Sequence, residues 1–102
     1  MIKIKTECIL FNMLAIYEQI TFDDLFNFVI EDENICSNLT NASVLFTIER
    51  YQDIFELSEN QIKKSDCFDE SYFNTVLEYY NYQLTNNEKE ALMKALHNRR
   101  TN

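Results

Sequence analysis

Apolar side chains recur every three or four positions through most of the chain, which is the spacing of one face of a helix. The pattern predicts helices over residues 6–19, from about 21 to the acidic run at 31–33, from residue 40 or 41, over 69–82 and after residue 85. We expect the core to form from the apolar positions of these helices, which are Ile9, Leu10, Met13, Leu14 and Tyr17; Phe22, Leu25, Phe26 and Val29; Val44, Ile48 and Tyr51; Tyr72, Phe73, Val76, Leu77 and Tyr80; and Ala91, Leu92, Ala95 and Leu96.

Two threonines mark expected helix starts. Thr21 is followed three residues later by Asp24, and Thr85 by Glu88. This spacing is that of the capping box, in which the two residues bond each other's backbone N–H groups. The acidic run at 31–33 would lie beside the carbonyl end of the second helix, where negative charge is unfavourable, so we expect that helix to stop there.

Short β-prone runs at residues 54–57 and 61–63 predict a β-hairpin after the third helix. The chain has no glycine, so we expect Asn60 to take the positive φ that a tight hairpin turn needs. Residues 2–5 alternate Ile and Lys, a pattern that fits a short strand or a frayed terminus.

The order of three helices and a hairpin over residues 6–65 resembles the winged helix-turn-helix family. The segment Ile20-Thr21-Phe22-Asp23-Asp24-Leu25 resembles the usual entry to that family's second helix, and Val44, Ile48, Tyr51 and Phe55 stand where the family buries apolar side chains. Residues 20–60 are also similar to the winged-helix domain of the bacterial RNA polymerase delta subunit, although they lack its tryptophan and wing glycine. We therefore expect one domain over 1–102, mainly α with a small β-hairpin: a winged-helix core (6–65) and two more helices (66–102). The alternative is an all-α bundle.

The winged-helix resemblance implies a DNA-binding surface, with the third helix in the major groove and the hairpin along the backbone. Asn and Arg can contact base edges, and Lys can pair with phosphate. The same surface would also present Phe46, with Asp53, Glu56 and Glu59 close by. The positions that match the family's contacts are Asn41, Ser43, Thr47 and Arg50 on the helix and Lys63 and Lys64 on the hairpin.

The net charge of −8 and the pI of about 4.5 favour a basic protein as partner over nucleic acid. Residues 18–33 contain no Lys or Arg. Small acidic chains of this kind resemble inhibitors from mobile elements, such as anti-CRISPR and anti-restriction proteins, that imitate DNA phosphates at a basic site. In that alternative the protein-binding residues are Asp23, Asp24, Glu31, Asp32 and Glu33.

Few residues suit catalysis or metal binding. The chain has one histidine, His97, and no glycine-rich phosphate loop can exist without glycine. Its three cysteines lack a C-x-x-C pair, so we expect free thiols in the cytoplasm. We expect no enzyme activity, catalytic residue, cofactor, metal, small-molecule substrate or membrane span.

The predicted fourth helix carries more tyrosines than one buried stripe requires. Tyr79 and Tyr82 fall off that stripe, and surplus aromatic residues are common at interfaces, so they predict a homodimer through the C-terminal helices. The leading functional hypothesis is a non-enzymatic winged-helix regulator that binds DNA or a protein of the transcription machinery. The alternatives are the acidic inhibitor and a structural interaction subunit.

Overall fold

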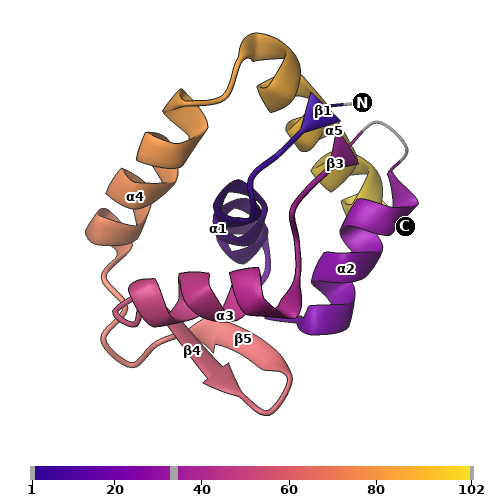
Figure 1. The fold of residues 1–102 in the computed structure, drawn as a ribbon. Helices are drawn as coiled ribbons and strands as arrows, with labels where there is room; N and C mark the ends of the chain where they lie inside the picture. Colours follow the sequence, from indigo (N-terminus) through magenta and orange to yellow (C-terminus); the bar gives the residue numbers. More distant parts are fainter. Residues whose placement is uncertain (1, 33–34, 102) are drawn as a thin grey trace.

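The computed structural model describes residues 2–32 and 35–101, with side-chain surroundings given up to residue 98. It is mainly helical with a small antiparallel sheet, as predicted, and the sheet rules out an all-α bundle (Figure 1). The helices are α1 (Thr6–Ile16), α2 (Phe22–Glu31), α3 (Asn41–Arg50), α4 (Glu70–Tyr82) and α5 (Asn86–Thr101). The strands are β1 (Ile2–Lys3), β2 (Gln19–Thr21), β3 (Ile35–Cys36), β4 (Phe55–Ser58) and β5 (Gln61–Lys64).

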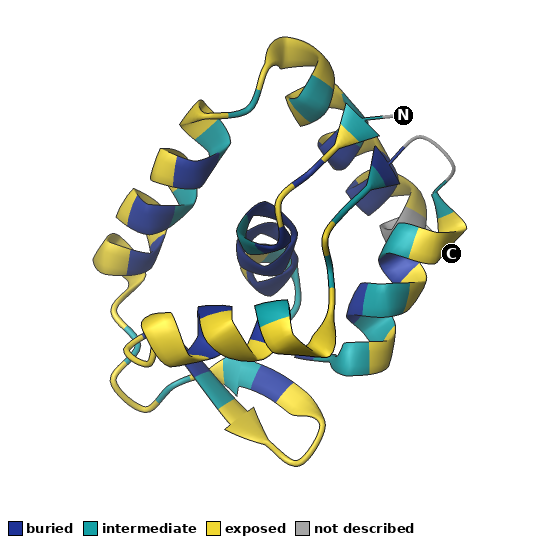
Figure 2. Ribbon diagram, viewed as in Figure 1, coloured by how far each residue is buried: buried dark blue, intermediate teal, exposed yellow. Residues whose placement is uncertain are grey.

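Helix α1 lies at the centre of the molecule, with the other helices and the hairpin around it (Figure 1). Every residue from Cys8 to Leu14 is buried, because a helix that is apolar nearly all round must be covered on every side (Figure 2). The ring of Phe11 contacts the rings of Tyr51, Phe55, Phe73 and Tyr80. This cluster joins α3 and the hairpin to α4 in one core.

Strand β2 corrects the predicted end of the first helix. The helix was expected to reach Gln19, but it stops at Ile16. Residues 19–21 instead pair antiparallel with β5, which places Ile20 opposite Ile62, and both of these side chains are buried. The sheet order is β2-β5-β4, so the strand depends on a partner about 40 residues away that local periodicity cannot reveal.

The predicted hairpin is confirmed, but its turn differs from the expectation. Ser58 pairs with Gln61, which leaves Glu59 and Asn60 as a two-residue loop. Glu59 has the positive φ, at 58°, where Asn60 was expected to have it. The carbonyl of Asn60 accepts a hydrogen bond from the Phe22 N–H at 3.3 Å, so a contact with α2 fixes its orientation.

The residues that cap the helices agree with the capping patterns in the sequence. Both predicted capping boxes are confirmed, at Thr21 with Asp24 and at Thr85 with Glu88. The start of α3 has a third box that the sequence analysis did not identify, in which Thr40 and Ser43 bond each other's backbone N–H groups. Asp69 caps α4 through the backbone N–H groups of Ser71 and Tyr72.

The alternating Ile and Lys residues at the chain start form a short strand. β1 pairs in parallel with β3, and the Ile4 N–H donates to the Cys36 carbonyl at 2.9 Å. Ile2 packs against the core, while Ile4 and Ile35 are part of it. This pairing places β3 beside β1, which also contacts α5. None of the described helices is long and apolar enough to cross a membrane.

Candidate functional site

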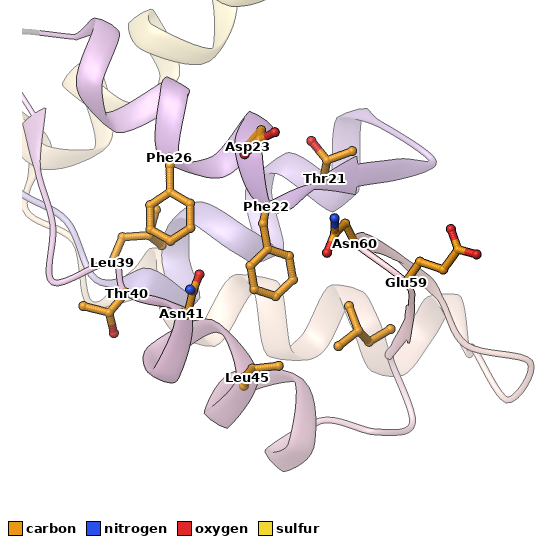
Figure 3. Close-up of a pocket in the computed structure, with 11 residues that line it drawn as sticks. Thr21, Phe22, Asp23, Phe26, Leu39, Thr40, Asn41, Leu45, Glu59 and Asn60 are labelled. Atoms are coloured by element: carbon orange, nitrogen blue, oxygen red, sulfur yellow. The ribbon is translucent and has the colours of Figure 1, made fainter.

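An open groove of about 920 Å³ lies between the start of α2, the start of α3 and the hairpin turn (Figure 3). Phe22 reaches from α2 toward Leu45 on α3, and the ring of Phe26 lies beside Leu39. Leu39 and Leu57 complete the apolar part of its wall. The polar residues that line the groove are Thr21, Asp23, Thr40, Asn41, Glu59 and Asn60.

Local sequence features place the walls of this groove. Phe22 and Phe26 are four residues apart on α2, and Asn41 and Leu45 are four apart on α3, so each pair lies on one side of its helix. The capping boxes fix where both helices begin. The Phe22–Asn60 backbone hydrogen bond then ties the start of α2 to the hairpin turn.

Two carboxylates, those of Asp23 and Glu59, are the only charged groups among the described residues that line the groove. Both residues are exposed. Leu45 is 45% exposed and Leu57 is 38% exposed, so part of the apolar wall of the groove faces water. The groove therefore combines an apolar wall with a negative rim.

Phe46 lies next to Leu45 in the sequence, is 74% exposed, and belongs to a different hollow. That hollow measures about 470 Å³ and lies where α3 adjoins α1. It includes Glu7 and Arg50, one charge of each sign. Helix α3 thus presents a separate apolar side chain to each of two hollows.

Two residues of α3 that were expected to be exposed for DNA contact are not fully exposed. Thr47 was expected to be exposed, but it is 4% exposed and its hydroxyl donates to the Ser43 carbonyl at 2.9 Å. It lies three residues after Val44, on the same buried side of α3. Ser43 is half-buried, and its hydroxyl takes part in the capping box and lies 3.2 Å from the Thr6 hydroxyl. Asn41 and Arg50 are exposed as predicted.

Each cation predicted to contact DNA has a partner within the chain. The Arg50 guanidinium lies 5.7 Å from the ring centroid of Tyr51. Lys63 Nζ lies 3.4 Å from a Glu56 carboxylate oxygen on the paired strand. Lys64 Nζ lies 4.8 Å from the ring centroid of Phe68. Of these three cations, Lys63 lies beside a carboxylate, whereas the aromatic rings beside Arg50 and Lys64 carry no charge that would offset theirs.

The acidic residues predicted for protein binding divide into two groups. Asp23 and Asp24 lie at the start of α2, and Asp24 accepts the Thr21 N–H in the capping box. Glu31 and Asp32 lie at the other end of the ten-residue helix, about 13 Å away at 1.5 Å per residue. Asp32 lines a separate hollow that also includes Lys94. Glu33 lies outside the described residues.

The side chains with reactive groups are dispersed. His97 is exposed on α5, and within the described part of the chain no hydrogen bond to its ring is recorded. Burial raises the pKa of the Cys8 thiol to about 11, with a smaller contribution from Glu7, so this thiol is protonated at neutral pH. Burial, followed by the hydrogen bond with Tyr51, also raises the pKa of Tyr80. Cys8, Cys36 and Cys67 are free thiols, as predicted.

Three residues expected in the core differ in the structure: Phe22 and Phe26 are half-buried and line the groove, and Tyr72 on α4 is exposed. The buried residues of α2 are Leu25 and Phe28. The sequence signal for their exposure was the width of the apolar stripe, because α2 carries more large apolar residues than one buried face needs.

The chain was compared with protein-family models, with curated proteins and with solved structures, and it matches none of them.

Proposed function

We propose that the chain is a non-enzymatic winged-helix regulator that works by binding a protein, not DNA, through the face formed by α3 and the hairpin. The order of three helices followed by an antiparallel hairpin supports the winged-helix assignment. In that assignment α3 is the recognition helix and β4–β5 is the wing.

The observation that carries the proposal is the composition of the groove between α2, α3 and the hairpin. Its walls expose leucine and phenylalanine side chains, and its charged lining residues are both acidic. DNA affinity comes largely from neutralised phosphates, with a salt slope of roughly −0.9 per phosphate, so three cations, one of them paired with Glu56, support only weak binding. Exposed apolar surface beside carboxylates fits a protein surface better.

The inhibitor alternative receives less support from the arrangement of the acids. A DNA mimic needs a row of carboxylates spaced like phosphates, and α2 separates Asp23 and Asp24 from Glu31 and Asp32. Asp23 and Glu59 line a groove whose wall is largely apolar.

Fluorescence anisotropy with a pool of short random-sequence DNA duplexes tests the proposal. We expect no saturable binding at low salt up to about 100 µM protein, the weak end of ordinary non-specific DNA affinity. The double variant Glu56→Lys/Glu59→Lys is the positive control, because it releases Lys63 and adds two cations to the hairpin. It should gain binding that falls as salt rises. Saturable DNA binding by the unaltered chain that Lys63→Glu abolishes would contradict the proposal.

We also propose that two copies associate through α4. Tyr79 is 61% exposed and Tyr82 is 88% exposed, while Phe73, Val76 and Tyr80 of the same helix are buried. Tyrosine combines a large apolar ring with a hydroxyl that tolerates water, and it is enriched at protein interfaces.

A further inference from the structure

We infer that the groove between α2, α3 and the hairpin takes an amphipathic helix of a partner protein, one that carries leucine-like anchors along one side and Lys or Arg beside them. The inference rests on the proposed function, and it names the chemistry of the partner segment.

The walls of the groove favour a helix as occupant. Phe22 with Phe26, and Asn41 with Leu45, form two ridges of side chains spaced four residues apart on neighbouring helices. Ridges of this spacing interdigitate with the same spacing on a third helix. Beyond their first turns, α2 and α3 use their backbone groups within their own helices, so these walls offer mainly side-chain packing in place of strand addition.

The negative charge of the groove favours basic residues on the flanks of the partner helix. Asp23 at the first turn of α2 and Glu59 at the hairpin turn are exposed at the rim, and among its described lining residues there is no Lys or Arg. The net charge of −8 adds a long-range attraction for a basic segment. An acidic segment would be repelled both at a distance and at the rim.

Apolar burial and ion pairing at the rim differ in how much they contribute to binding and in what they determine. Exposed ion pairs contribute less to affinity than the burial of a large apolar side chain. The apolar anchors should therefore supply most of the affinity, with Leu45 and Leu57 as the exposed side chains that become covered. The basic flanks should raise the association rate and determine which partners bind.

A synthetic peptide serves as the probe, because its apolar stripe and its charge can be changed separately. The peptide has about 18 residues, long enough for partial helicity in water, with Leu at helical spacing and Lys on the flanks. A scrambled peptide has the same composition without the apolar stripe. A third peptide replaces each Lys with Glu. Binding of each labelled peptide to the complete chain is followed by fluorescence anisotropy.

We expect the amphipathic basic peptide to bind at least about tenfold more tightly than the scrambled and acidic peptides. Leu45→Ser should weaken that binding about fivefold, since it removes a partly exposed leucine from the groove wall. Phe46→Ser is the matched control: it removes an even more exposed apolar side chain on the adjacent position, outside the groove, and should leave the affinity within about twofold. Both sites are exposed, so circular dichroism should show unchanged folding.

The role of the acidic rim is tested by a second pair of variants. Glu59→Lys should weaken binding of the basic peptide, whereas Glu78→Lys on the exposed side of α4 makes the same change in net charge and should weaken it less. Equal effects of these two variants, equal binding of the scrambled peptide, or an unchanged affinity in Leu45→Ser would each overturn the inference. DNA binding by the unaltered chain would overturn the proposed function itself. Absence of both DNA and peptide binding would overturn only the inference about the helix.

Discussion

At the scale of single residues, the buried amide pair between Asn12 and Asn81 shows how a polar side chain is accommodated in an apolar helix. The Asn12 Nδ2 donates to the Cys8 carbonyl at 2.7 Å and to the Asn81 Oδ1 at 2.8 Å. The Asn81 Nδ2 donates back to the Asn12 Oδ1 at 3.1 Å. Because buried amides are costly without partners, this pair fixes the register of α1 against α4.

Asn12→Ala should lower the free energy of unfolding by about 1–3 kcal/mol, because it leaves the Asn81 amide without its partner. The change is measured by urea denaturation. Asn74→Ala, at an exposed position of α4, should have a much smaller effect. The double variant Asn12→Ala/Asn81→Ala should lose less than the sum of the single changes, since the two side chains act together. Additive losses would show that the pair is not coupled.

At the scale of elements, the hairpin connects the fold to the groove. β5 pairs with both β2 and β4, and the turn residue Asn60 accepts a backbone hydrogen bond from the first residue of α2. Glu59 contributes a rim carboxylate while it occupies a left-handed conformation that a side chain makes unfavourable. A side chain at this position therefore costs some stability, and in the proposed function it supplies one carboxylate of the binding surface.

Replacing Glu59 by glycine should raise the free energy of unfolding by about 0.5–1 kcal/mol, because glycine accepts a positive φ without steric cost. Asn60→Gly is the comparison, since Asn60 does not have a positive φ and should gain nothing. Thermal unfolding of both variants decides between the two positions. A gain in Asn60→Gly and none in Glu59→Gly would place the left-handed residue at Asn60.

At the scale of the whole molecule, the net charge of −8 opposes self-association, so a contact between copies requires an uncharged surface. Helix α4 offers one: Tyr72, Tyr79 and Tyr82, all exposed, fall within about 80° of one another at 100° per residue. Thr75 falls within the same range, and the C-cap residue Gln83 lies about 20° outside it. Lys5, which donates to Gln83 at 3.4 Å, lies at one end of α4, and the acidic cap Asp69 lies at the other. An antiparallel pair of α4 helices would bring these opposite charges together at both ends.

Sedimentation velocity over a wide concentration range tests this association. We expect the unaltered chain to form a dimer at high concentration, and Tyr79→Glu or Tyr82→Glu to shift it to the monomer by placing a carboxylate in the contact. Ile30→Glu adds the same charge at another exposed apolar position, on α2, and should leave the dimer intact. A strict monomer at near-millimolar concentration would refute the proposed contact.

The features that the sequence predicted correctly depend on residues close together in the chain. The capping threonines Thr21 and Thr85 specify their helix starts through bonds to residues three positions on. The hairpin follows from two β-prone runs around a short turn. These interactions are local, so periodicity and residue type are sufficient to identify them.

The features that only the tertiary structure determines depend on contacts between residues distant in sequence. Residues 19–21 form a strand because β5 lies beside them, and Thr47 is buried because the inner side of α3 packs against α1. The groove arises in the same way, since Phe22, Leu45 and Leu57 come from three elements that only the folded chain brings together. Local patterns show which residues are apolar, but the completed packing determines which of them remain accessible to a partner.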